Sequence, residues 1–351
     1  MSHLLARIPL DPPWRNLVRP FIPGLIWVAS ASACATPALL SGPTAPQQNV
    51  ATPPITTTEG QWREQPPLLT PRAAHAVVNT REAIYALAGT GPDGPVLTVE
   101  RFDGRNWMTE TTLPGDGLNA PAAVVWGGQI YLIGGFNTTT NVPSSAVLVY
   151  DLNQHTWGEA PPLPAPRGGH AAAVLNGQIH VVGGGNSLST IADHSVFDPT
   201  TQTWTNRAPL PRSEGSPALV AWEGRLYAIG GRSGFSDFGD VYIYDPNTDV
   251  WSTGPAIPPR GTAGAAVYCG TIYLFGGESQ ATESSLDEVF RLAPDREDWT
   301  RQAPLPHARN FARAVLFQDE IYVVGGSPTA GSSHMSTGST FVESFKIQCG
   351  S

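Results

Sequence analysis

Lysine, cysteine and charge of either sign are scarce in this sequence. Of its 351 residues 14% are charged, one is a lysine, Lys346, and three are cysteines, while the formal net charge is −9. A protein that grips a phosphate backbone needs a positive balance, so nucleic acid is not an expected partner. Three cysteines cannot form a disulfide framework, and we favour free buried thiols at Cys269 and Cys349 over a pair between them.

Metal-ligand spacing is missing as well. The histidines are scattered, and no His-x-x-x-His or clustered Cys/His pattern suggests zinc or iron. We therefore predict no metal and no cofactor.

Glycine and proline, by contrast, are abundant, at 37 and 34 residues. Strand-forming runs lie between them, which is typical of an all-β protein.

The first 34 residues have the pattern of an export signal. Three arginines precede an apolar run over 21–33 that is too short to span a bilayer, and the small residues 31–33 suit a cleavage site. We therefore predict a signal peptide over 1–34 and an exported protein, in the periplasm or at the cell surface. The alternative is a disordered tail after a poorly chosen start codon.

Cys34 directly follows this cleavage pattern, which resembles the lipobox of bacterial lipoproteins. That resemblance implies acylation of Cys34, although Ala31 stands where the family usually has leucine. Acylation and simple cleavage stay open, and a lipid anchor is the one membrane contact we expect. Residues 35–58 carry no charge and are rich in proline and threonine, so we predict a disordered tether.

Six short apolar segments, each ending in two small residues, recur along the rest of the chain. They have a spacing of 46 to 49 residues, which indicates a repeat architecture. Their short length and terminal glycines favour buried strands. The segments are Ile84–Gly89, Ile130–Gly135, Ile179–Gly184, Leu226–Gly231, Ile272–Gly277 and Ile321–Gly326.

A tryptophan recurs in step with the glycines, and an aromatic residue, followed by aspartate in four copies, lies between the two landmarks. Each unit therefore reads as four antiparallel strands. The first tryptophan, Trp62, precedes any glycine segment, and the last unit has no tryptophan after Phe345. We predict that the strand around Trp62 completes the last unit, which removes an open sheet edge. The six tryptophans are Trp62, Trp107, Trp157, Trp204, Trp251 and Trp299.

This combination of strand, double glycine, aromatic residue with aspartate, and tryptophan resembles the kelch repeat. The resemblance implies a β-propeller of four-stranded antiparallel blades. We predict an all-β, six-bladed kelch propeller over 59–349, and we expect a monomer.

Long, dissimilar loops between the second and third strands and the connections from fourth to first strands should share one face, where binding usually lies. Several arginines fall in those connections or directly after the glycines, so a positive well for an anionic ligand is one hypothesis. The other is structural, with the arginines bound to loop carbonyls. The arginines are Arg72, Arg167, Arg212, Arg232, Arg260 and Arg309.

The same positions make the contacts in kelch domains that grip acidic peptides. By that resemblance the candidate ligand-binding residues are these six arginines with Asn310, Phe136 and Glu278. We expect a peptide, glycan or protein as the partner. The alternative resemblance is to secreted six-bladed kelch sugar epimerases or mutarotases, with Glu278 or Glu214 as base and Arg232 or Arg260 as its partner. A carboxylate bound to an arginine in a closed pocket would favour the enzyme, and a wide mouth would favour binding.

Overall fold

The computed structural model describes residues 60–293, 297–331, 336–347 and 349. The predicted signal peptide over 1–34, the tether over 35–58 and the acylation site Cys34 lie outside these residues and stay predictions. Throughout the described ranges, no helix has the length and apolar character needed to cross a membrane.

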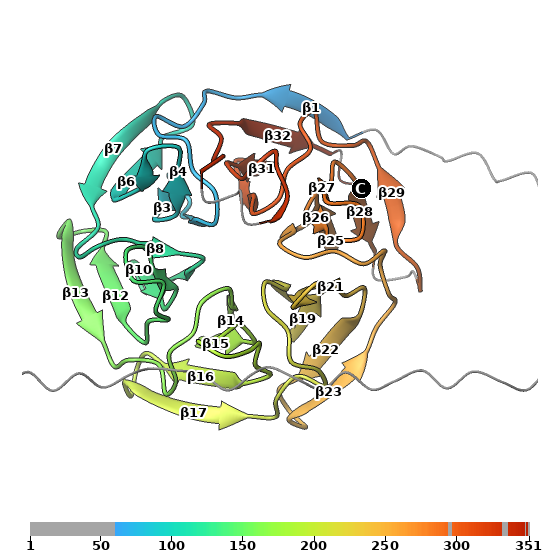
Figure 1. The fold of residues 1–351 in the computed structure, drawn as a ribbon, viewed down its shortest axis with the longest axis horizontal. Coiled ribbons are helices and arrows are strands. Elements are labelled where there is room, and N and C mark those ends of the chain that lie inside the picture. Colours follow the sequence, from blue (N-terminus) through green and yellow to red (C-terminus); the bar gives the residue numbers. More distant parts are fainter. Residues whose placement is uncertain (1–59, 294–296, 332–335, 348, 350–351) are drawn as a thin grey trace, which may run out of the picture. The chain divides into compact units, whose positions relative to one another are not determined.

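Six four-stranded antiparallel sheets surround one axis, so the predicted six-bladed propeller is confirmed. The first strand of each blade lies nearest the axis and the fourth lies on the perimeter (Figure 1). Blade 1 contains β2 (Ala76–Asn79), β3 (Ile84–Leu87), β6 (Thr98–Phe102) and β7 (Trp107–Thr112); blade 2 contains β9 (Ala122–Trp126), β10 (Gln129–Ile133), β12 (Val147–Asp151) and β13 (Thr156–Ala160); and blade 3 contains β14 (Ala171–Leu175), β15 (Gln178–Val182), β16 (His194–Asp198) and β17 (Thr203–Arg207).

The second half of the ring repeats this order. Blade 4 contains β18 (Ala218–Trp222), β19 (Arg225–Ile229), β22 (Val241–Asp245) and β23 (Val250–Thr253); blade 5 contains β24 (Gly264–Tyr268), β25 (Thr271–Phe275), β28 (Val289–Leu292) and β29 (Thr300–Gln302); and blade 6 contains β30 (Arg313–Phe317), β31 (Glu320–Val324), β32 (Val342–Lys346) and β1 (Gln61–Glu64). Four two-stranded sheets pair β4 (Thr90–Gly91) with β5 (Gly94–Pro95), β8 (Leu118–Asn119) with β11 (Phe136–Asn137), β20 (Arg232–Ser233) with β21 (Ser236–Asp237), and β26 (Glu278–Ser279) with β27 (Ser284–Ser285).

The ring closes as the sequence predicts. Strand β1 from the start of the described chain pairs with β32, and Trp62 lies opposite Phe345 in that register. Strand β1, the first strand of the described chain, is therefore the outer strand of the last blade.

Burial follows the strand order within each blade. The last four residues of every second strand are buried. In the first strands, by contrast, the second and fourth residues are partly exposed. The double glycine ends each second strand because a side chain would not fit there. At Gly230, for example, φ is +62° and a Cβ atom would lie 2.6 Å from the carbonyl oxygen of Arg260 in the next blade.

Most of the repeated tryptophans tie one blade to its neighbour. In five of them the indole Nε1–H donates to a backbone carbonyl of the preceding blade. These bonds join Trp62 to Ala303 (3.1 Å), Trp107 to Pro66 (2.9 Å), Trp204 to Pro161 (2.8 Å), Trp251 to Ala208 (2.8 Å) and Trp299 to Pro255 (2.8 Å). Each ring thus buries apolar area and satisfies its polar atom at once.

A ring of backbone hydrogen bonds encircles the axis at one end of the first strands. One residue per blade has a left-handed conformation there, and five consecutive N–H to C=O bonds link the blades in order. The residues are Ala74, Ala120, Gly169, Ser216, Thr262 and Phe311. The buried ring of Phe311 packs with Ala74 and Ala120 and lies 5.4 Å from the guanidinium carbon of Arg232 in blade 4. Phe311 thus contacts both sides of the channel and narrows it at this level.

Cys269 and Cys349 form a disulfide with Cα atoms 5.5 Å apart. The favoured prediction of free buried thiols is therefore wrong, since both residues are exposed and paired. Cys269 follows β24 in blade 5, whereas Cys349 follows β32 in blade 6. Spacing in the sequence could not reveal this proximity because it arises from closure of the ring.

Candidate functional site

The loops predicted to share a face do lie together. In every blade the connection that precedes the first strand pairs with the residue directly after the double glycine. Examples are the bridges from Gly215 to Arg232, from Gly261 to Glu278 and from Asn310 to Ser327. We call the end of the ring where these bridges lie the mouth.

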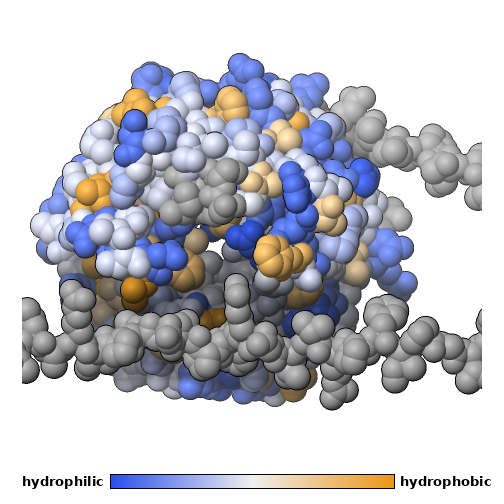
Figure 2. All heavy atoms as spheres, viewed as in Figure 1, coloured by the Kyte–Doolittle hydropathy of each residue, from blue (hydrophilic) through white to orange (hydrophobic). Residues whose placement is uncertain are grey.

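A pocket of about 470 Å³ opens at the mouth. Its lining includes Phe136, Thr190, Arg232, Phe235 and Gln280, together with glycines of blades 3, 4 and 6. We call it the mouth pocket. Viewed down the axis, the molecule has a hollow near its centre bordered by both hydrophilic and hydrophobic residues (Figure 2).

Arg232 is the cation of the mouth pocket, and a buried carboxylate holds it. Its Nη1 donates to Oε1 of Glu278, which is 0% exposed, while the Arg232 side chain is 24% exposed. The second oxygen, Oε2, accepts from Asn310 Nδ2 at 3.3 Å and from the backbone N–H of Gly331 at 2.9 Å. Both oxygens of Glu278 are therefore occupied, whereas the Nε–H and Nη2–H groups of the Arg232 side chain have no hydrogen-bond partner among the described residues.

Two phenylalanines give the mouth pocket its apolar character. The half-buried ring of Phe136 lies so close to Gly168 that a Cβ atom there would be 2.3 Å from it. Phe235, between β20 and β21, is 96% exposed. An exposed aromatic ring beside an arginine is a feature of protein-binding surfaces.

Four of the predicted arginines lie inside the blades instead. Arg72 donates to Oε1 of Glu100 at 2.5 Å and to the carbonyl oxygen of Thr98 at 3.0 Å. The equivalent arginines have the same kind of partners, namely Arg167 with Asp193, Arg260 with Glu288 and Arg309 with Glu343. All four are at most 1% exposed. Their contacts fit the structural alternative.

Arg212 also pairs with a carboxylate, but it lies at the surface of its blade. It is half-exposed, pairs with Asp240 at 2.5 Å and lies over the ring of Phe238. Each of the six predicted arginines therefore has a carboxylate partner. The positive well expected at the mouth is not formed, because these carboxylates compensate the charge. Of the nine predicted residues, the structure brings Phe136, Arg232, Glu278 and Asn310 together at the mouth.

Glu214 lies in blade 4 at the place that arginine occupies in four other blades. Its carbonyl accepts from the N–H of Gly184, just as that of Arg260 accepts from Gly231. The carboxyl is 0% exposed, and neither oxygen has a hydrogen-bond partner among the described residues. Burial raises the pKa of Glu214 to about 8. Since Glu278 and Glu214 are both buried, neither offers a carboxylate to the mouth pocket.

The sequence reasoning missed Arg313, the first residue of β30. Its strand partner is Val324, directly before a double glycine, and the equivalent residues of the other blades are Ala76, Ala122, Ala171, Ala218 and Gly264. A comparison of the first strands, position by position, would have revealed this one arginine among small residues. No group of three or more His, Cys, Asp or Glu residues in the described ranges could hold a metal ion.

A family model supports the fold from sequence. The KLHDC2/KLHL20/DRC7 Kelch-repeats domain matches residues 55–210 and 122–326. The solved structure titled "Structure of YjhT" superposes with a TM-score of 0.70 at 16% identity, over 81% of this chain and 97% of that one. At this identity the likeness concerns the fold alone.

Curated relatives match over shorter stretches. Kelch-like protein 36 of Rattus norvegicus is 30% identical over 122 residues, 32% of this chain and 20% of the relative. Beta-scruin of Limulus polyphemus is 28% identical over 137 residues, 37% of this chain and 15% of the relative. The matched stretches thus span a fifth or less of these relatives. With the repeat, the six blades and the family match in agreement, the chain belongs to the kelch-repeat family.

Proposed function

We propose that this protein is an exported recognition module whose mouth pocket binds an extended segment of a peptide or protein. The segment places an apolar side chain between Phe136 and Phe235 and an oxygen acceptor on Arg232. Kelch propellers generally bind proteins, which supports a protein-like ligand.

The observation that carries this proposal is the state of Arg232. Glu278 fixes its guanidinium group and compensates its charge, while unoccupied N–H donors remain beside two aromatic rings. A neutral pair attracts a free anion weakly, yet it still donates hydrogen bonds to a carbonyl or carboxylate. Recognition by apolar contact together with one directed polar contact is therefore favoured over capture by charge alone.

The disulfide between Cys269 and Cys349 supports export. Disulfides persist in oxidising compartments and are rare in the cytosol. The signal pattern over 1–34 points the same way. Secretion of the chain in a bacterial host, followed by mass spectrometry of its N-terminus, distinguishes cleavage before Cys34 from acylation of that residue.

Selection from a library of linear peptides displayed on phage tests the binding proposal, with the full chain as the target. We expect enrichment of an aromatic or aliphatic residue next to an acceptor such as aspartate, glutamate or asparagine. Phe235→Ala should weaken binding of the selected peptides about ten-fold, which corresponds to the loss of a contact of about 1.4 kcal/mol.

Leu188→Ala is the matched control, because Leu188 is 94% exposed on a neighbouring loop and does not line the mouth pocket. Gly215→Ala adds a methyl group at ordinary contact distance from Thr190, with a permitted φ, and narrows the pocket without strain. Equal binding by wild type, Phe235→Ala and Gly215→Ala would refute the mouth pocket as the binding site.

A further inference from the structure

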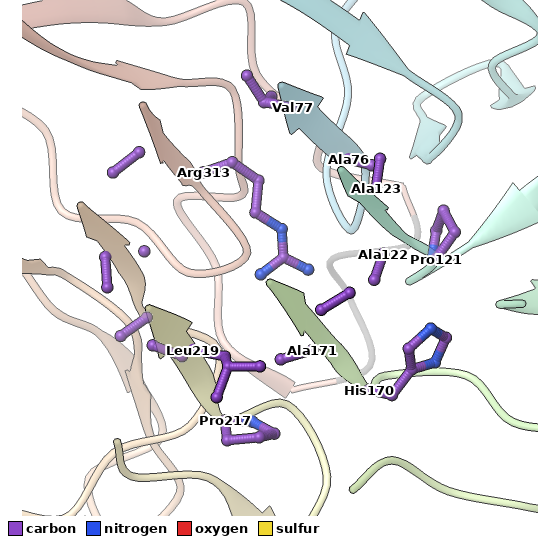
Figure 3. A pocket seen from close by; sticks show the side chains of 16 residues that line it. Ala76, Val77, Pro121, Ala122, Ala123, His170, Ala171, Pro217, Leu219 and Arg313 are labelled. Carbon is purple, nitrogen blue, oxygen red and sulfur yellow. The ribbon is translucent and has the colours of Figure 1, made fainter. Parts of the chain in front are cut away.

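Arg313 is a cation in the central channel of the propeller. Its side chain extends from β30 into the space between the first strands, where the labelled alanines of other blades are short (Figure 3). The surrounding cavity has a volume of about 140 Å³. Arg313 is its one charged lining residue among the described parts of the chain, and alanine, valine, leucine and proline make up most of the wall.

No acidic partner accompanies this arginine in the described ranges. Its Nε–H donates to the backbone carbonyl of His75 at 3.0 Å, and none of the ion pairs there includes Arg313. Desolvation lowers the pKa of Arg313 to about 10, so the group is still protonated at neutral pH. The guanidinium Nη groups therefore carry positive charge into the channel between the first strands.

The other titratable groups near the channel add no negative charge. Burial lowers the pKa of His170 to about 3 and that of His75 well below its usual value, so both rings are neutral at pH 7. Arg72 and Arg309 are the further charged groups that act on His75, and their carboxylates, Glu100 and Glu343, lie within the blades. Arg313 is therefore the charged side chain of the cavity wall among the residues that the structure describes.

Arg313 is partly exposed to the channel and its guanidinium group has no counter-charge among the described residues, so an anion in contact with it gains charge-assisted hydrogen bonds. We propose that the central channel is a binding site for a small anion, held by the Nη–H groups of Arg313. The occupant is compact, because the cavity has room for the volume of about five water molecules. Halide, nitrate, acetate and phosphate fit this size, and planar oxoanions match the guanidinium fork.

This site is separate from the mouth pocket. Phe311 narrows the channel between the two, since it packs against blades 1 and 2 and lies near Arg232 of blade 4. The second and fourth residues of the first strands are partly exposed, so solvent reaches the channel along these strands. The anion site therefore does not depend on the proposed function of the mouth.

Thermal unfolding of the full chain in different sodium salts at one ionic strength tests the proposal. Sodium gluconate is the reference, because this sugar acid is too large for the cavity. Replacement of gluconate by chloride, nitrate or phosphate should raise Tm with saturation, as binding to the folded state requires. Arg313→Ala, which copies the residue of four other blades, should abolish that rise.

Arg212→Ala is the control, because it removes one positive charge from the surface ion pair with Asp240 and should keep the full response. Titration with bromide, followed by anomalous diffraction, should place an anion at the Arg313 guanidinium group in the wild type. In gluconate, Arg313→Ala should be the more stable protein, and small anions should reduce that difference. The proposal is overturned if wild type and Arg313→Ala respond equally to small anions, or if bromide is absent from the channel.

Discussion

Trp62 packs against Phe345 with the ring centroids 4.7 Å apart and the rings tilted by 36°, although one residue lies near the start of the described chain and the other near its end. Trp62 also contacts Phe275 of blade 5, at 5.9 Å between centroids. One side chain thus joins β1 to its own blade and to the neighbouring blade. Closure of the ring depends on this cluster more than on the backbone pairing of four residues.

Trp62→Ala should lower the free energy of unfolding by about 3 kcal/mol, because it removes a large aromatic ring from that cluster. Denaturant unfolding followed by circular dichroism measures the loss. Arg63→Ala on the same strand alters only an exposed pair with Glu320 and should change stability by less than about 0.5 kcal/mol. Similar stability of Trp62→Ala and wild type would show that closure does not rely on this residue.

The disulfide should stabilise the folded protein by up to about 4 kcal/mol, since it closes a loop with a sequence separation of 80 residues. We expect a reducing agent to lower the Tm of the wild type to that of Cys349→Ser. The Tm of Cys349→Ser itself should not respond to the reducing agent. A reduced wild type that melts at the oxidised temperature would contradict this.

The buried arginines should matter for folding. Glu100→Gln leaves the guanidinium group of Arg72 buried without its counter-charge, which costs about 3–5 kcal/mol. Asp240→Asn removes the partner of the half-exposed Arg212 and should cost less than about 1 kcal/mol. Urea unfolding of the two variants checks the contrast, and equal losses would show that burial does not set the strength of these pairs.

Glu214 should make stability depend on pH. Its pKa is about 8 in the folded protein, above the usual carboxyl value, so the folded state holds a proton that the unfolded state releases. The contribution of Glu214 to the free energy of unfolding is therefore highest below about pH 4.5 and falls as pH rises from about 4.5 to 8, by about 5 kcal/mol in all.

Glu214→Leu, which copies Leu118 at the equivalent position of blade 2, should remove this slope and stabilise the protein at pH 8 and above. Unfolding free energies of both proteins between pH 5 and pH 9 provide the measurement. Parallel pH profiles would mean that Glu214 is solvated or paired.

The fold was readable from the sequence because its landmarks are local and repeat. Each double glycine marks the end of a second strand, and each tryptophan lies at or beside the start of a fourth strand. The position of Trp62 ahead of the first unit indicated how the ring closes. The disulfide was missed because Cys269 and Cys349 meet only after blades 5 and 6 pack together.

The site was readable in part for a related reason. Residues directly after the glycines, such as Phe136 and Arg232, reach the mouth as expected from their place in the unit. The ion pairs of the arginines could not be predicted in this way. The carboxylates that pair with Arg72 and Arg260 come from the third strand or the loop before it, and only the folded blade brings them beside the arginines. Arg313 differs from these arginines, because its unusual place in the repeat is visible in the sequence: the equivalent residue of every other blade is alanine or glycine.

Hydrogen exchange of the full chain with and without a peptide selected on it tests the central claim most directly. We predict slower exchange at the mouth, in residues 136–144, 185–190 and 232–238, when the peptide binds. The turns at the opposite end, 176–177 and 245–249, should be unchanged. Protection of those turns, with no change at the mouth, would contradict the account.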